Sequence, residues 1–369
     1  MLTHFYSFAG RGGLLIASVF FFTTNDGHAQ SADSIKLDYR KIYAACLDAD
    51  VASALKLLEI SDAKTSVRDA KFKTDFEARF KYDTDRSDFL IKKKSDIDEL
   101  LSVYHEYWRS SLLNPDQNYD SILTVKIGGI LSRAYRLSLN TIINTDSLGF
   151  YLNKYVKSKG LYTTGWGKTG KLFDLLVWRV EKDTTYSFKL NKEKLTARVF
   201  MMDNFVTLGW EEYATFGRAF PGGWATREAL FCVQKSYNLK SENFNISYLA
   251  HEGRHFADYK IFPKLSSADL EYRGKLTELS MARTSLYTLI ESFIRNANYD
   301  SQNGHSIANF CAIRELSRSI FKQEFQKDMA EWKKISVEKI NKTANEILKA
   351  NTRALQRAGN DIEKFIKPQ

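Results

Sequence analysis

The spacing of hydrophobic positions changes twice along the chain. From about residue 35 to 160, apolar residues recur every three or four positions, as in IYAACLDADVASALKLLEI and DIDELLSVYHEYWRSSLL, which predicts helices. From about residue 172 to 235 the period shortens toward two. The segments LFDLLVWRV, TYSFKL, TARVFMMDNFV and REALFCV are rich in β-branched and aromatic residues and are separated by polar or glycine-containing turns, which predicts a small sheet.

After residue 245 the helical period returns and continues to the C-terminus. Long amphipathic stretches run from Ala268 to Asn296, from Ile307 to Trp332 and from Val337 to Ile366. This order of helices, small mixed sheet and helices predicts an α+β fold that is predominantly helical. We expect a helical N-terminal region over residues 30–160 and a second region over residues 161–369, divided near the glycine-rich stretch YTTGWGKTGK.

The first 29 residues have the layout of a secretory signal peptide. Arg11 precedes the apolar run from Leu14 to Phe22, and small residues, Gly27 and Ala29, lead to a cut after Ala29. We therefore expect a leader over residues 1–29 and an extracytoplasmic mature protein, in the periplasm or secreted. The apolar run is much shorter than the roughly 20 residues that cross a bilayer, and no later segment reaches that length, so stable membrane insertion is not expected.

Charge and cysteine content add little to this description. The net charge of +10 survives removal of the leader, because Arg11 and Asp26 cancel. Basic and acidic residues are interspersed, which is typical of solvated helical surfaces; attraction to an anionic polymer or membrane surface of the cell envelope is the alternative. The export signal argues against nucleic-acid binding. Three cysteines permit one disulfide at most, so no disulfide framework is expected.

The pentapeptide HEGRH at residues 251–255 is the main candidate for chemistry. On a helix, residues four apart share a face, so His251 and His255 can bind one metal ion. Glu252 lies about 100° around the helix from His251. It therefore borders the ion and is placed as a general base for a zinc-bound water. Gly253 in mid-helix is either a position of close backbone approach or a tolerated glycine.

The local sequence predicts that HEGRH lies on a helix. Asn245 is a plausible N-cap, and Phe244 and Leu249 are spaced as a hydrophobic staple. Pro263 limits the far end of this helix.

With this motif the chain resembles the zincin class of zinc metallopeptidases, over roughly residues 172–300. The resemblance implies a sheet above the HExxH helix, on whose edge strand an extended peptide binds, and a third metal ligand further along the chain. REALFCV would be the counterpart of that edge strand. In the gluzincin arrangement the third ligand is a glutamate of the next helix, here within SSADLEYRGKLTEL, whose serines suit a helix cap.

Two glutamates of that segment are candidates for the third ligand. Glu271 and Glu278 share a face but are about 10.5 Å apart along the helix, so only one can bind, and we prefer Glu271 in the first turn. Asp258 lies equally far from His251 along its own helix. We assign it instead as an acceptor that orients a ligand histidine.

Several further residues are candidates for supporting roles. His305, in NGHSIANF, is the expected donor to a developing oxyanion, with Tyr272 the weaker choice; a capping or packing histidine is the alternative. His105, in YHEYW, is expected in an aromatic cluster. Trp224 after Pro221-Gly222-Gly223 is interpreted as a core tryptophan after a turn that enters a strand.

These patterns lead to one preferred function and two alternatives. The preferred hypothesis is an exported zinc peptidase that acts on a peptide or protein substrate. The first alternative is a non-catalytic binding or scaffold protein of the cell envelope that keeps a zincin fold and contacts a partner through its helical regions. The second is a metal-dependent hydrolase of a non-peptide substrate.

Overall fold

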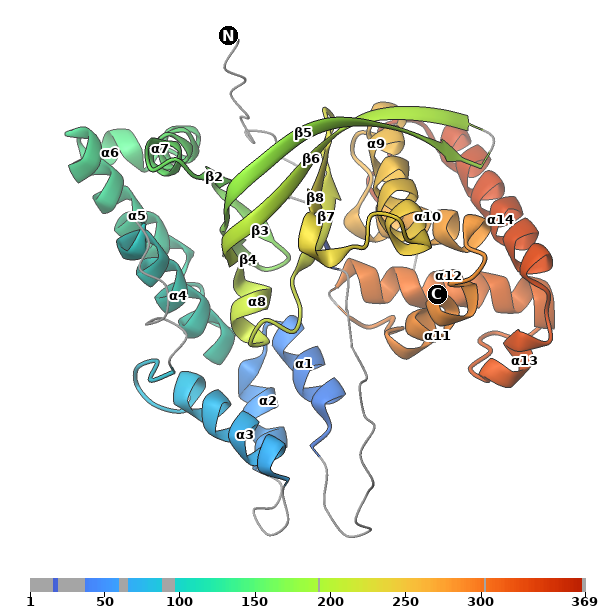
Figure 1. Ribbon diagram of the computed structural model, residues 1–369, viewed down its shortest axis with the longest axis horizontal. Coiled ribbons are helices and arrows are strands. Elements are labelled where there is room, and N and C mark those ends of the chain that lie inside the picture. The colour runs from blue at the N-terminus through green and yellow to red at the C-terminus, as the bar shows by residue number, and fades with distance from the viewer. Residues whose placement is uncertain are drawn as a thin grey trace. The chain divides into compact units, whose positions relative to one another are not determined.

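A computed structural model describes residues 16–18, 37–59, 66–87, 97–191, 193–301 and 303–366 (Figure 1). The expected leader lies outside the described residues except for Ile16–Ser18. The described chain divides into two compact units. Of the described residues, those from 37 to 180 and from 204 to 220 belong to the N-terminal unit, and residues 16–18, those from 181 to 203 and those from 221 to 366 belong to the C-terminal unit. The domain boundary expected near residue 160 stays a prediction.

The N-terminal unit is built mainly from helices. Their starts follow from local capping, because the side chains of Asp38, Asp50 and Ser66 accept hydrogen bonds from the first-turn backbone of three of them. The helices are α1 (Tyr39–Leu47), α2 (Val51–Leu58), α3 (Val67–Phe80), α4 (Asp98–Leu113), α5 (Asp120–Tyr135), α6 (Leu139–Ile142), α7 (Thr145–Ser158) and α8 (Trp210–Ala214). Three short strands, β2 (Tyr162–Thr163), β3 (Gly167–Thr169) and β4 (Leu172–Asp174), complete this unit.

The core of the N-terminal unit confirms the interpretation of His105 as an aromatic-cluster residue. Its ring is buried and stacks on Tyr213, with 5.2 Å between the ring centroids, and it lies 5.5 Å from Trp108. Burial lowers the pKa of His105 to about 4, so its ring is neutral. This histidine is accounted for by packing.

A mixed sheet contains two long strands, β5 (Leu176–Leu190) and β6 (Glu193–Leu208). The strand order is β1-β7-β8-β6-β5-β2, with β1 (Ile16–Ser18), β7 (Pro221–Ala225) and β8 (Leu230–Val233). β8 runs parallel to β6 and antiparallel to β7. LFDLLVWRV and TYSFKL, predicted as separate strands, contribute β4 and one continuous strand, β5.

The sheet corrects two expectations. REALFCV supplies β8, which lies between β6 and β7 and is therefore not an edge strand. Pro221-Gly222-Gly223 is not a turn but the start of β7. Glycine is needed at position 223, because a Cβ would lie 2.4 Å from the Phe231 carbonyl oxygen and 2.5 Å from the Tyr248 ring. Trp224 is fully buried and stacks on Phe231, as expected of a core tryptophan.

The helices of the C-terminal unit follow the sheet in sequence. They are a 3₁₀ turn η1 (Gln234–Ser236), a π-helical segment η2 (Asn243–Ala250), α9 (His251–Ile261), α10 (Ser267–Met281), α11 (Leu286–Arg295), α12 (Gly304–Phe321), α13 (Met329–Lys333) and α14 (Val337–Ala358). The three long stretches predicted from the sequence are therefore each shorter or interrupted. α10 packs against α9, α12 and α14 (Figure 1), which is why nearly all its side chains are buried.

The described elements confirm the predicted fold class, α+β and predominantly helical. Within the described residues, no helix is both long and apolar enough to cross a membrane.

Candidate metal centre

The helix that carries HEGRH begins earlier than its sequence suggests. Asn245 is not its N-cap, because η2 already starts at Asn243 and continues directly into α9. The Ser241 hydroxyl accepts a hydrogen bond from the Phe244 backbone, while the Asn245 amide donates to the Ser241 carbonyl oxygen. π-Helical turns are rare and are frequent at functional sites. At its far end α9 stops at Ile261, before Pro263, as predicted.

The next helix starts where its serines predict. Ser266 is the N-cap of α10, and its hydroxyl accepts a hydrogen bond from the Asp269 backbone. This start places Glu271 in the second turn of α10, facing α9.

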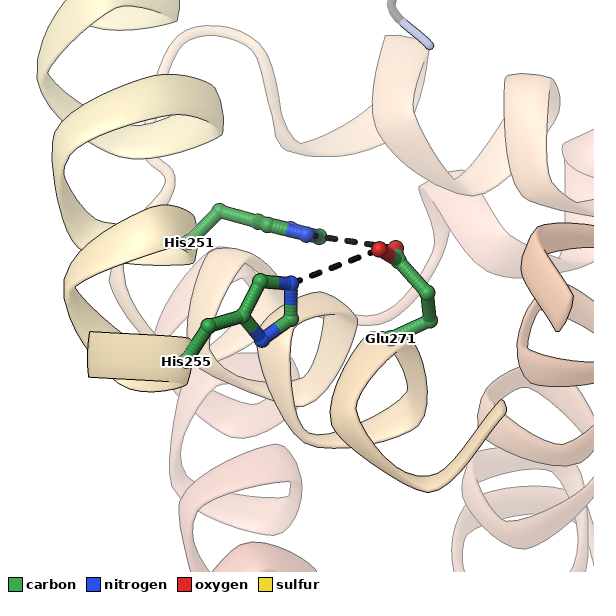
Figure 2. A group of neighbouring side chains, drawn as sticks. All are labelled: His251, His255 and Glu271. Carbon is green, nitrogen blue, oxygen red and sulfur yellow. Dashed lines mark ion pairs between the residues drawn. The ribbon is translucent and has the colours of Figure 1, made fainter. Parts of the chain in front are cut away.

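Two residues of α9 and one of α10 converge on a common point (Figure 2). His251 Nε2 lies 3.2 Å from Glu271 Oε2, and His255 Nε2 lies 3.3 Å from Glu271 Oε1. One ligand atom from each of the three residues lies within 4.8 Å of the others. His251, His255 and Glu271 therefore form a group that could hold a metal ion.

The donor atoms of this group fit a cation. All three side chains are buried, and His251 Nε2, His255 Nε2 and Glu271 Oε1 have no hydrogen-bond partner among the described residues. Buried polar atoms without a partner are unfavourable by about 1 to 3 kcal/mol each. A cation between two imidazoles and a carboxylate would satisfy all three atoms.

The electrostatics of the group also favour positive charge at its centre. Burial opposes protonation of His251, but the carboxylates of Glu271 and Glu278 outweigh it and raise the pKa of His251 to about 10. Burial lowers the pKa of His255, which keeps that imidazole neutral. Burial would raise the pKa of Glu271, yet His305 and His251 hold it well below its ordinary value. An ionised carboxylate and a neutral imidazole are the forms that bind metal.

Glu252 lies beside this group and does not belong to it. Its side chain is buried, and Oε2 has no hydrogen-bond partner among the described residues. Burial raises the pKa of Glu252 to about 8, and the positive charges of His251 and Lys275 act against that rise. A buried carboxyl with a raised pKa is suited to accept and return a proton near neutral pH.

The structure distinguishes the two glutamates that the sequence left as alternatives. Glu278 lies 2.7 Å from the other ring nitrogen of His251, Nδ1, where a ring N–H donates to Oε1. A carboxylate in that position fixes the orientation of the imidazole and directs Nε2 toward Glu271.

The supporting role expected of Asp258 is therefore filled by Glu278. Asp258 is fully buried and accepts hydrogen bonds from Arg273 Nε, at 2.6 Å, and Nη2, at 2.8 Å. Its place on the same helix face as the histidines did not reveal this partner, because Arg273 comes from another helix.

His305 and Tyr272 lie in different surroundings. His305 Nδ1 is 2.8 Å from Glu271 Oε2, so this histidine adjoins the candidate metal centre. Tyr272 is buried in the hydrophobic core of the C-terminal unit, with Leu276 and Cys311, and burial raises its pKa strongly. The oxyanion role for Tyr272 has no support from this placement.

Two residues near the site were not identified from the sequence. A Cβ at Gly274 would lie 2.6 Å from His251 Cε1, so glycine makes room there for the imidazole. Lys275 is only 7% exposed, with Nζ 4.6 Å from the centre of the Phe293 ring. The sequence could have indicated both residues, because Gly274 and Lys275 follow Glu271 by three and four positions and such residues lie on the same helix face.

Gly253 makes room on α9 for a neighbouring side chain, and not for the backbone approach that was one of the two expectations. A Cβ at this position would lie 2.4 Å from Cε2 of Phe188, in β5. The glycine in HEGRH therefore lets a ring of the sheet pack directly against α9.

Comparison of the chain with protein-family models, curated proteins and solved structures finds no match.

Proposed function

We propose that this protein is an exported zinc-dependent peptidase of the gluzincin type. The single observation that carries the proposal is the convergence of His251, His255 and Glu271, with Glu252 directly after the first histidine. Two imidazoles and one carboxylate are the protein ligands of many catalytic zinc sites, which keep a position open for water or substrate.

Zinc bound there would supply a Lewis acid that polarises the scissile carbonyl and makes a water molecule more acidic. The oxygen of the attacking water bonds to the carbonyl carbon, and Glu252 takes a proton from that water. The C–N bond then breaks, and Glu252 returns the proton to the leaving amine. The burial of Glu252 supports this assignment, because its Oε2 has no hydrogen-bond partner among the described residues and is available for a proton.

The remaining residues act on the ligands. Glu278 holds His251 through Nδ1, and Gly274 leaves the space that the ring occupies. These contacts support a rigid ligand set, which a catalytic metal site requires. The layout of residues 1–29 supports export, and the substrate we propose is a peptide or protein outside the cytoplasm.

Replacing Glu252 with Gln tests the proposal. We expect the variant to bind zinc in the same stoichiometry as the wild type, because Glu252 is not a ligand, and to lose hydrolysis of a fluorogenic peptide library by at least about a hundredfold. A matched control is Glu228→Gln, at an exposed site outside the centre. Full activity of the Glu252 variant, or a zinc-loaded wild type without activity, would contradict the proposed reaction.

A further inference from the structure

The start of α12 brings a third histidine against the candidate metal centre. The N-cap of α12 is Asn303, whose side chain accepts a hydrogen bond of 2.9 Å from the His305 backbone. This bond fixes the backbone of His305 at the second position of an 18-residue helix.

Gly304 allows this helix start to approach α10 closely. A Cβ at Gly304 would lie 2.7 Å from the Ser267 hydroxyl oxygen and 3.1 Å from the Ala268 backbone nitrogen. Ser267 and Ala268 open α10, one turn before Glu271. The close approach therefore carries the His305 side chain toward the Glu271 carboxylate.

The contact itself is made by one atom of each residue. His305 Nδ1 lies 2.8 Å from Glu271 Oε2, with 15% of the histidine side chain and 1% of the glutamate side chain exposed. The other carboxylate oxygen, Oε1, faces His255. Oε2 also lies 3.2 Å from His251 Nε2, and neither carboxylate oxygen has a hydrogen bond among the described residues. His305 is thus placed to hold Oε2 of this candidate ligand through its 2.8 Å contact.

From this geometry we infer that His305 is a positioning residue, which fixes the Glu271 carboxylate through Nδ1. This role differs from the oxyanion donor expected from the sequence, and it rests on the metal site of the proposed function but not on peptidase activity. Groups that hold a ligand carboxylate in place restrict its rotation and strengthen metal binding. Their removal lowers the affinity for the metal ion by about 10- to 100-fold.

The test measures affinity for Zn²⁺ by competition with a chromophoric chelator, in metal-free protein. We expect His305→Ala to weaken zinc binding by about 10- to 100-fold. His305→Asn should retain most of the affinity, because its amide nitrogen can occupy the place of Nδ1. Ser306→Ala, one residue further along the same helix, should bind zinc like the wild type. Thermal unfolding of the metal-free variants verifies that each is folded.

A second measurement uses Co²⁺, whose visible absorption reports the ligand set. A positioning role predicts that Co²⁺-loaded His305→Ala keeps the wild-type absorption envelope at saturating metal. A changed envelope would make His305 a direct ligand and overturn the inference, as would zinc affinity unaltered by His305→Ala. Failure of the wild-type chain to bind Zn²⁺ would overturn both this role and the proposed function, whereas an inactive wild type that binds Zn²⁺ would overturn only the latter.

Discussion

At the scale of single residues, the candidate metal centre depends on two neighbours of its ligands on α10. Gly274 gives the His251 ring its space, and Lys275 places a positive charge near Glu252. Neither residue binds metal in our account. Both therefore allow the arrangement of the centre to be tested without removal of a ligand.

Gly274→Ala should weaken metal binding. The added Cβ would lie 2.6 Å from Cε1 and 2.7 Å from Nε2 of His251, so the ring must move away from Glu271. We expect a loss of about tenfold or more in zinc affinity, measured by chelator competition. Gly253→Ala is the matched control: its Cβ would meet Phe188, which should lower stability by about 1 to 3 kcal/mol without weakening zinc binding. Equal zinc affinities for Gly274→Ala and the wild type would contradict the described position of His251.

Lys275→Met should shift the pH dependence of hydrolysis. Lys275 lowers the pKa of Glu252, so loss of the ammonium raises that pKa. Because the base acts only when deprotonated, the acidic limb of the kcat/KM profile should move to higher pH. Lys275→Arg keeps the charge and should leave the limb in place. A limb that stays fixed, or moves to lower pH, in the methionine variant would count against Glu252 as the base.

At the scale of elements, a buried ion pair joins three helices of the C-terminal unit. Arg273 on α10 donates two hydrogen bonds to Asp258 on α9 and reaches Asn351 and Thr352 on α14. Both charged side chains are almost fully buried. The pair is thus expected to hold α9 and α10 in the relative position that the metal ligands require.

Arg273→Met should lower the free energy of unfolding by about 3 to 5 kcal/mol, since the buried Asp258 carboxylate loses both hydrogen bonds from Arg273 and keeps the more distant Arg254, at 3.7 Å. The double variant Arg273→Met/Asp258→Leu should lose less than the sum of the single losses, because the carboxylate that loses the Arg273 hydrogen bonds is itself removed. Denaturant titration measures each value. Lys264→Ala, which removes an exposed pair with Asp361, should change stability by no more than about 0.5 kcal/mol. Additive losses in the cycle would show that the two residues do not interact.

The elements also show which parts of the structure the sequence could predict. The paired histidines of α9 follow from helical spacing, and the start of α10 follows from a serine cap, both of which are local signals. A glutamate of α10 as third ligand was implied by the resemblance to zincins, and Glu271 was preferred over Glu278 for its place near the start of that helix. The partner of Asp258 is not local: Arg273 meets it only when α9 packs on α10. β7 was missed because proline and glycine normally disfavour strands, and Gly223 is explained by the close approach of Tyr248 and Phe231.

At the scale of the whole molecule, the candidate centre belongs to one of the two compact units. His251, Glu252, His255, Glu271 and His305 all lie in the C-terminal unit. The candidate ligands therefore come from one body, in which α10 contacts both α9 and α12. The fold class was predictable at this scale, because it depends on the order of helical and strand periods and not on individual contacts.

The proposed export concerns the whole chain. Cleavage after Ala29 should give a mature protein that begins at Gln30, and it should be found outside the cytoplasm. Mass spectrometry of the N-terminus of the exported protein measures the cleavage point. Replacing Ala29 with a bulky residue, as in Ala29→Trp, should block processing, whereas Ala32→Trp beyond the cut should not. An exported protein that still carries Met1–Ala29 would contradict the leader.

The proposed function requires that His251, His255 and Glu271 together hold zinc. Elemental analysis of the protein purified without chelators tests it most directly, on the wild type and on His251→Ala, His255→Ala, Glu271→Ala and Glu278→Ala. Our account predicts one zinc per wild-type chain, loss of the metal in each of the first three variants, and weakened binding in the fourth. Wild-type protein without stoichiometric zinc, or a Glu271→Ala variant that retains it, would contradict the claim.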